Sequence, residues 1–413
     1  MKFERVDQIV RWRLCLGCGA CAALCPNGAI HMHNIEDQGI RPLVNDTKCE
    51  ACGRCVAVCP GIGIAHGLFN GDTLSELRQG WGPVLEVWEG YASDPEIRFK
   101  GSSGGIATAL ALFCLDNGLA KSVLQTRDNP ESPLENITIL SEDRDSLIAS
   151  TGSRYSPAAP CEKLDLLRQA DSCSVVIGKP CDIVALRKAQ ETDEQLDKNV
   201  ALAVSIFCAG TPSRTGTRRI LDALGVDPDH VEQIRYRGHG WPGMTSVKTK
   251  DARHARAEMT YSRSWGDILS KHVQFRCRLC PDSTGEFADI ACGDPWYRRI
   301  DPDEPGRSLV LVRTEQGREI LSKAIQAGYV TLDPAAPRVL ASSQESLLKR
   351  RKHLWGRLLA MRIMRIPAPD FRGFSLFANW TDLSLLDKAR SIGGTFKRIV
   401  QRGLSKPSAD PHR

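Results

Sequence analysis

The first 60 residues of the chain contain cysteines whose spacing suits iron–sulfur chemistry. Two runs of the form C-x2-C-x2-C-x3-C-P account for eight of the sixteen cysteines. In such a run, three closely spaced thiolates bind one 4Fe-4S cube, and the fourth cysteine binds a second cube. The spacing therefore predicts two cubes, one bound by Cys15, Cys18, Cys21 and Cys59 and the other by Cys49, Cys52, Cys55 and Cys25.

Two other common uses of clustered cysteines fit this pattern less well. Zinc binds paired CxxC motifs, but a zinc site requires neither a third cysteine in the same run nor a proline after the fourth. Disulfide frameworks are typical of secreted chains. The opening residues, Met-Lys-Phe-Glu-Arg-Val-Asp, lack the apolar core of a signal peptide. We therefore expect iron–sulfur clusters.

Length and charge limit the class of protein. A chain of 413 residues predicts two or three domains. No apolar run reaches the roughly 18 residues of a transmembrane helix, so we expect a cytoplasmic protein in a reducing compartment. The net charge is +6, and residues 349–413 hold 15 Lys and Arg but only 4 Asp and Glu. The remainder is slightly acidic, so we expect no nucleic-acid partner.

The elements that must position these residues are predicted by alternating patterns after residue 84. Short β-rich runs alternate with helical stretches, which indicates an α/β body. Strands are predicted at 84–91, 121–126, 174–177, 200–207, 287–291 and 308–312. Helices are predicted at 105–115, 161–170, 180–190, 213–224 and 315–327.

The predicted fold class is α/β, with an α+β ferredoxin-like module followed by a larger α/β body. We expect four parts. They are a two-cluster module at 1–70, a flavin-binding part at 84–170, the rest of the body at 171–335, and a basic helical tail at 336–413.

A glycine-rich loop precedes the helix predicted at 105–115. Its sequence, Gly-Ser-Ser-Gly-Gly, starts at Gly101. Free backbone N–H groups and the positive end of the helix dipole would suit a diphosphate. The alternative is an ordinary helix start, and the segment Thr-Gly-Ser-Arg-Tyr at 151–155 could be an ordinary turn.

Four further cysteines form a looser set. Cys181 opens a predicted helix, and Cys208 ends a predicted strand. Their positions alone suggest small buried apolar residues. Cys277 and Cys280 form a CxxC motif, which could be redox-active or bind zinc. We interpret the remaining four cysteines as structural, with Cys292 a possible neighbour of a cofactor.

Several segments together resemble a known family. They are GSSGGIATAL at 101–110, GSRYSP at 152–157, GKPCDIVALR at 178–187, residues 206–208, and FRCRLCPDSTGEFADIACGD at 275–294. In this order they are similar to the beta subunits of coenzyme F420 (deazaflavin) hydrogenases and formate dehydrogenases. That family includes 7-hydroxymethyl chlorophyll a reductases and one type of divinyl chlorophyllide vinyl reductase.

The resemblance implies cofactors and site residues. Members of the family bind FAD beside a 4Fe-4S cluster. The cluster ligands correspond here to Cys181, Cys208, Cys277 and Cys280. The flavin-binding residues correspond to Ser102, Ser103, Gly104 and Gly105, with a second contact at Gly152, Ser153 and Tyr155. The resemblance therefore implies a third cluster and FAD.

Motifs and resemblance together predict an iron–sulfur flavoenzyme. We expect electrons to pass between the clusters and FAD, where an organic substrate gains or loses two electrons. The expected partners are a ferredoxin or a dehydrogenase subunit, and a small-molecule substrate. The alternative is an electron-transfer subunit of a hydrogenase or dehydrogenase complex that uses a deazaflavin and has no substrate of its own. No catalytic acid or base is identifiable, although His239 lies in a loop that could face the flavin.

The tail contains a basic amphipathic segment at 346–366, SLLKRRKHLWGRLLAMRIMRI. Its apolar residues have spacings compatible with one helix face. Such a helix can pack on the body with its basic face solvated. Alternatively, it can make peripheral contact with an anionic membrane or bind an acidic partner.

Overall fold

The computed structural model of the chain describes residues 2–67, 72–250, 256–301 and 304–408. The domain boundary expected at residue 70 lies outside these ranges. No helix in the described ranges is long and apolar enough to cross a membrane.

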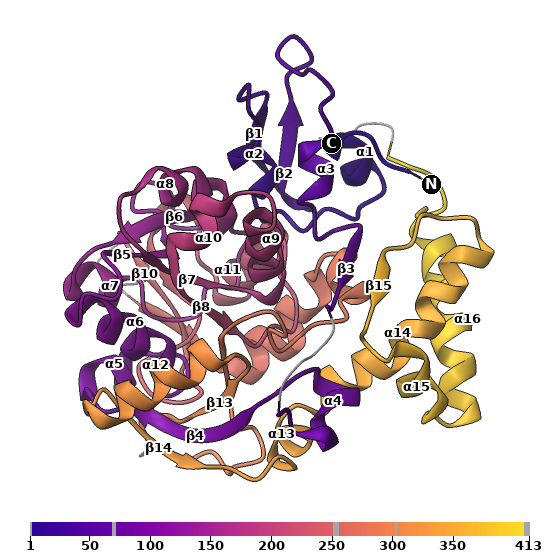
Figure 1. Cartoon of the computed structure of the whole chain (residues 1–413). Coiled ribbons are helices and arrows are strands. Elements are labelled where there is room, and N and C mark those ends of the chain that lie inside the picture. The colour runs from indigo at the N-terminus through magenta and orange to yellow at the C-terminus, as the bar shows by residue number, and fades with distance from the viewer. Residues whose placement is uncertain (1, 68–71, 251–255, 302–303, 409–413) are drawn as a thin grey trace.

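The body is built around an eight-stranded mixed sheet (Figure 1). In spatial order its strands are β14 (Val330–Pro334), β4 (Glu86–Ala92), β13 (Ser308–Val312), β12 (Ile290–Gly293), β8 (Val200–Ile206), β7 (Ser174–Gly178), β5 (Ser122–Asp128) and β6 (Asn136–Ser141). The central strands β12, β8, β7 and β5 run parallel, and the outer pairs are antiparallel. All six runs predicted as strands lie in this sheet, so the α/β class is confirmed.

Helices cover both faces of this sheet. They are α5 (Pro95–Lys100), α6 (Ile106–Asp116), α7 (Arg144–Ala149), α8 (Leu164–Gln169), α9 (Pro180–Gln190), α10 (Glu194–Lys198) and α12 (Glu315–Gln326). Successive strand residues point to opposite faces. Val123 and Val175 pack with α6 and α12, whereas Leu124 and Val176 pack with α8 and α9. The apolar helix α6 is buried along most of its length.

An insertion between β8 and β12 forms a second, smaller sheet. Its strands are β9 (Val231–Arg235), β10 (Thr245–Thr249) and β11 (Arg256–Met259), paired antiparallel. Helix α11 (Arg214–Leu224) and the π-helix Ser262–Ile268 pack on it. Short 3-10 helices are Pro160–Lys163, Pro228–His230, Leu269–His272 and Arg276–Leu279.

The N-terminal module lies at one end of the body, beside α9 (Figure 1). It contains α1 (Val6–Arg11), α2 (Ala20–Ala23), the hairpin of β1 (Ile30–Ile35) and β2 (Gly39–Val44), α3 (Arg54–Ala57) and β3 (Gly63–Ala65). Gly19 marks a close approach to the body. A β-carbon there would lie 2.6 Å from the backbone nitrogen of Glu162, and its φ is +94°. Glycine is needed for both reasons.

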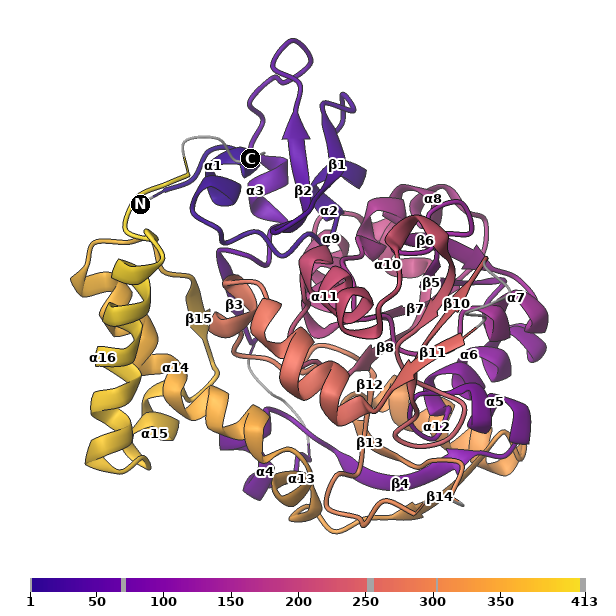
Figure 2. The ribbon, with the colours of Figure 1, turned by 180° about the vertical axis from the view of Figure 1, so that it is seen from behind.

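The tail packs on the N-terminal module and the body (Figure 2). It contains α13 (Val339–Ser343), α14 (Glu345–Ile363), β15 (Asp370–Arg372), α15 (Leu376–Thr381) and α16 (Leu385–Gln401). Helix α4 (Ser75–Trp81), which lies in the chain between the N-terminal module and β4, contacts α14 and α15. Strand β15 pairs in parallel with β3. Leu354, Leu358 and Met361 of α14 share one core with Ile9 and Leu14 of the module. The structure thus favours the packed helix over the membrane-bound alternative.

Candidate functional site

The first predicted set of N-terminal thiols is brought together by the fold. Burial raises the pKa of the Cys21 thiol, and the nearby thiols of Cys18, Cys15 and Cys59 raise it further. Backbone N–H groups point at two of these sulfurs, from Gly17 to Cys15 (3.3 Å) and from Gly61 to Cys59 (3.4 Å). Hydrogen bonds to cluster sulfurs are one of the features that set redox potential. Cys55, which the spacing assigns to the second set, also acts on Cys21, so the two sets are neighbours.

The second predicted set surrounds a small cavity of the module. Cys25, Cys49, Cys52 and Cys55 all line it. The N–H of Ala29 donates to the sulfur of Cys25 (3.2 Å). Cys52 is exposed, whereas Cys15, Cys18, Cys21 and Cys59 are buried. The second set therefore lies nearer the solvent than the first.

The third set is assembled from three separate parts of the body. Cys181 lies in the first turn of α9, Cys208 follows β8, and Cys277 and Cys280 lie in and just after the 3-10 helix Arg276–Leu279. Burial raises the pKa of Cys208 to about 11, and the Cys277 thiol contributes. Burial also raises the pKa of Cys280 to about 12, with contributions from Cys277 and Cys208. Cys181 likewise interacts with Cys208 and Cys277.

Backbone N–H groups also point at two sulfurs of the third set. Those of Gly210 and Thr211 donate to the sulfurs of Cys208 (3.4 Å) and Cys277 (3.5 Å). Hydrogen bonds of this kind also reach sulfurs of the first and second sets. Across the described ranges, no three His, Cys, Asp or Glu side chains are grouped as ligands of a single metal ion.

The two segments expected to contact a flavin meet at one cavity of about 320 Å³. Ser102, Ser103 and Gly105 line one part of it, and Gly152, Ser153 and Tyr155 line another. The hydroxyl of Ser102 accepts a hydrogen bond from the N–H of Ser153, which ties the two segments together. Other walls include Cys208, Cys292, Tyr261, Trp265 and Trp296. The cavity thus extends from the glycine-rich loop to a cysteine of the third set.

Gly104 departs from the expectation. Its N–H donates to the hydroxyl of Ser308 (2.8 Å), and a β-carbon there would lie 2.7 Å from the carbonyl oxygen of Gly90. It is absent from the described lining of the cavity. Gly104 therefore allows the loop to pack against the sheet, and we no longer expect it to contact a ligand directly.

A buried ion pair at this cavity was missed by sequence reasoning. The guanidinium of Arg237 binds both carboxylate oxygens of Asp294, at 2.9 and 2.7 Å. The indole N–H of Trp241 also donates to Asp294 (2.8 Å). Arg237 lies over the ring of Tyr261, 4.7 Å from its centroid. No local pattern links residues 57 positions apart, although Asp294 ends one of the segments that resemble the family.

A second ion pair lies near Cys181. The ammonium of Lys179 is 2.6 Å from the carboxylate of Asp182, and both residues line the cavity. Burial lowers the pKa of Lys179, but Asp182 and the thiols of Cys181 and Cys208 outweigh burial and raise it. The lysine is therefore a fixed cation between the third thiol set and the cavity.

A basic cavity of about 310 Å³ adjoins the first and shares residues 150–154 with it. Its lining includes Lys100, Arg127, Arg235 and His239. His239 stacks on Phe99, with ring centroids 5.2 Å apart. Burial lowers the pKa of His239, and nearby Arg235 lowers it further. The histidine therefore lines the basic cavity, and it is not among the described residues that line the first cavity.

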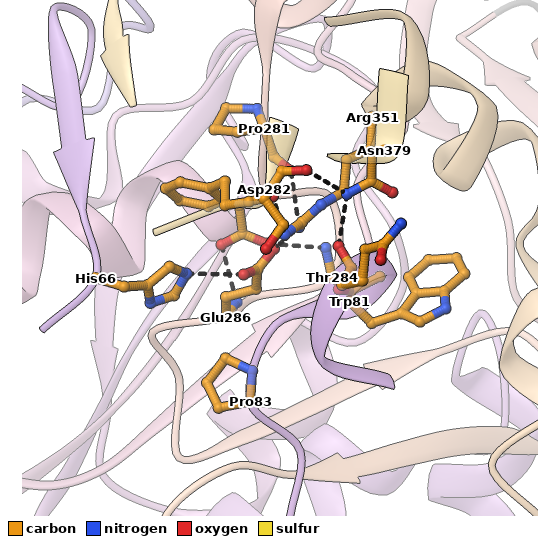
Figure 3. Close-up of polar contacts among 12 residues, drawn as sticks. His66, Trp81, Pro83, Pro281, Asp282, Thr284, Glu286, Arg351 and Asn379 are labelled. Carbon is orange, nitrogen blue, oxygen red and sulfur yellow. Dashed lines mark hydrogen bonds and ion pairs between the residues drawn. The ribbon is translucent and has the colours of Figure 1, made fainter. Parts of the chain in front are cut away.

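A buried polar network supports the loop that follows Cys280 (Figure 3). Nε2 of His66 lies 2.8 Å from Glu286, and Arg351 of α14 pairs with the same carboxylate. The carboxylate of Asp282 accepts hydrogen bonds from the N–H groups of Thr284, Gly285 and Glu286. The network joins the N-terminal module, the body and the tail.

Comparisons with known proteins agree with these motifs. Residues 87–164 match the family described as coenzyme F420 hydrogenase/dehydrogenase, beta subunit N-term, and residues 171–338 match the corresponding C terminus. Residues 14–61 match a 4Fe-4S dicluster domain.

Curated relatives include three archaeal proteins. The chain is 28% identical over 274 residues to the F420-dependent formate dehydrogenase 1 subunit beta of Methanococcus maripaludis, covering 64% of this chain and 66% of that one. It is 26% identical over 262 residues to the coenzyme F420 hydrogenase subunit beta of Methanothermobacter thermautotrophicus, covering 61% and 85%. It is 24% identical over 350 residues to the coenzyme F420-dependent sulfite reductase of Methanocaldococcus jannaschii. That alignment covers 76% of this chain but only about half (47%) of the relative.

One solved structure shares the fold. A chain in the xenon-derivatized F420-reducing [NiFe] hydrogenase complex from Methanosarcina barkeri aligns with a TM-score of 0.53 and 24% sequence identity. The alignment covers 67% of this chain and 93% of that one.

Proposed function

This chain belongs to the coenzyme F420 hydrogenase/dehydrogenase beta-subunit family, and we propose that it is an iron–sulfur electron-transfer subunit of an oxidoreductase complex that exchanges electrons with a deazaflavin coenzyme. The sequence alone favours an enzyme that acts on its own substrate at the flavin. The relatives named as beta subunits of formate dehydrogenase and hydrogenase support the electron-transfer alternative better.

The observation that carries this proposal is the serial arrangement of three thiol sets and one cavity. Arg276 directly precedes Cys277 of the third set in the chain. Its side chain donates to the carbonyls of Pro60 and Gly61, the two residues that follow Cys59 of the first set. Cys208 of the third set lines the 320 Å³ cavity. In the proposed route, electrons pass between the N-terminal module and the cavity through the third set.

We propose FAD as the occupant of the cavity. When bound, FAD exchanges two electrons with an organic partner and releases them singly to one-electron carriers. Tyr155, Tyr261, Trp265 and Trp296 offer flat aromatic walls suited to a ring system. The start of α6 suits a diphosphate. Lys100, Arg127 and Arg235 of the adjoining cavity suit phosphates or another anionic group of the coenzyme.

Anaerobically purified protein tests this proposal. We expect about 12 irons per chain, since four cysteines bind each cube of four irons, together with one FAD. We expect a reduced deazaflavin to transfer electrons to an artificial one-electron acceptor. Cys181→Ser should remove about four irons and abolish this transfer. Cys173→Ser is the control, because Cys173 lies outside the three sets. It should change neither the iron content nor the electron transfer. Full transfer by Cys181→Ser would contradict the route.

One observation favours a self-contained reductase as a second candidate. The alignment with the F420-dependent sulfite reductase covers 76% of this chain, and this chain carries its own dicluster module. A self-contained reductase would turn over an organic or inorganic substrate as an isolated chain supplied with reduced ferredoxin. Turnover that requires a co-purifying subunit would instead support the electron-transfer role.

A further inference from the structure

Arg276 is a buried cation without a carboxylate partner in the described part of the chain. Only 1% of its surface is exposed. Its guanidinium donates to three backbone carbonyls, those of Gly61 (2.7 Å), Leu279 (3.0 Å) and Pro60 (3.1 Å). Two of these carbonyls belong to the N-terminal module, and the third belongs to the turn that carries Cys277. The side chain therefore joins the module to the body.

Two other buried arginines pair with carboxylates: Arg237 pairs with Asp294, and Arg351 pairs with Glu286. Arg41 and Arg313 are also buried, and the hydrogen bonds of their guanidinium groups go to carbonyl, hydroxyl and amide oxygens. A buried charge is strongly unfavourable unless an opposite charge compensates it. An arginine stays protonated even when buried. Negative charge close to Arg276 would therefore stabilise its buried guanidinium.

The groups around Arg276 identify a source of such charge. Two of the carbonyls that Arg276 binds belong to Pro60 and Gly61, which directly follow Cys59 of the first set. The other belongs to Leu279, between Cys277 and Cys280 of the third set. Burial lowers the pKa of Arg276, and thiols of both sets oppose that effect. A cube held by four thiolates carries net negative charge, so each set supplies the charge that Arg276 lacks.

We propose that Arg276 is the positioning and charge-compensating residue between the first and third clusters. This inference rests on the proposed third cluster. Reduction adds one negative charge to a cube, and a nearby fixed cation stabilises that reduced form. Arg276 therefore raises the potentials of both clusters. Its three hydrogen bonds also fix the distance between the two cubes. One electron would move over this distance from one cube to the other, and no bond would form or break.

Lys188 provides a matched control. Its ammonium donates to the carbonyl of Cys59 (3.3 Å) and interacts with the Cys59 thiol. No interaction of Lys188 with the third set is found within the described ranges. Removal of its charge should therefore affect the first cluster alone.

Electron paramagnetic resonance during redox titration of the full, cluster-loaded chain tests the inference. Arg276→Gln keeps amide donors but removes the charge, and it should shift two midpoint potentials to more negative values. Lys188→Met should shift only the midpoint potential of the first cluster. Cys181→Ser, which lacks the third cluster, identifies the signal that belongs to it. Arg276→Lys keeps the charge and should restore both potentials, while electron transfer between the two clusters stays slower than in the wild type.

The outcomes separate this inference from the proposed function. Three clusters with unchanged potentials in Arg276→Gln would overturn the inference alone. A wild-type chain with only about eight irons would overturn the third cluster, and the inference with it. If Arg276→Gln does not fold, Arg276→Lys decides. Midpoint potentials of both clusters that are more negative in Arg276→Lys than in the wild type would show that the charge of residue 276 does not set them.

Discussion

At the scale of single residues, Glu286 connects the N-terminal module with the tail. Its carboxylate is fully buried and binds His66 from the N-terminal module and Arg351 from the tail. Burial alone would raise the pKa of Glu286, but Arg351 and His66 outweigh burial and hold it at about 2. The carboxylate is therefore ionised in the folded protein at any ordinary pH.

We expect Glu286→Gln to destabilise the protein by about 3–5 kcal/mol at neutral pH, because it leaves a buried cation unpaired. The folded-state pKa of about 2 lies below the ordinary value of 4.5. The stabilisation is thus complete above pH 4.5 and is lost as the pH falls toward 2. Anaerobic denaturant titrations at several pH values should show a difference from the wild type that shrinks below pH 4.5.

Glu319→Gln is the control for this prediction. Glu319 forms an exposed ion pair with Lys323 one helical turn away. Exposed pairs contribute little to stability. Equal effects of the two substitutions would show that burial of Glu286 does not matter.

The cysteines show which site residues a sequence can reveal. The N-terminal eight were predictable because cluster geometry fixes their spacing. Cys181 and Cys208 are separated from Cys277 by a whole subdomain, so only the family resemblance grouped them. Arg276 was not predicted, since its partners are backbone carbonyls and thiols without a sequence signature.

At the scale of elements, burial decided which strands were predictable. The six strands found from sequence include the central parallel ones, which are apolar because both faces are covered. The edge strands β6 and β14 were missed because polar residues interrupt them. The small sheet of β9, β10 and β11 was missed for the same reason, because its strands carry Arg, Glu and Lys.

At the scale of elements, we also make a prediction for the loop at residues 101–105, which precedes α6. Ser102→Ala removes the acceptor of the Ser153 N–H and separates the two segments that line the cavity. An unsatisfied N–H costs about 1–3 kcal/mol, so we expect FAD affinity to fall about tenfold or more, measured by flavin fluorescence on titration. The stability of the N-terminal clusters should not change.

Gly104→Ala serves as the contrast. Its β-carbon would meet the backbone of β4 and β13, not the cavity. We expect it to lower the melting temperature of the whole body, with flavin loss only as a consequence. Selective loss of flavin at unchanged stability would mean that Gly104 does contact the cofactor.

At the scale of the whole molecule, the tail completes the N-terminal module. Truncation before Glu345 removes β15, Arg351 and the apolar residues of α14 that cover Ile9 and Leu14. We expect such a chain to lose iron from the N-terminal module, measured by iron content and visible absorbance. Removal of only residues 409–413 should leave the iron content unchanged. Full iron content in the longer truncation would show that the module is independent of the tail.

The parallel pairing of β3 with β15 also sets the order in which the protein matures. On the ribosome, residues 63–65 emerge about 305 residues before 370–372. At about 5–20 residues per second this separation corresponds to roughly 15–60 s of synthesis. Throughout that interval the edge of β3 lacks its partner, and the apolar surface later covered by α14 is open. Iron and sulfide thus have a limited time for delivery, which ends when the segment from α14 onward docks.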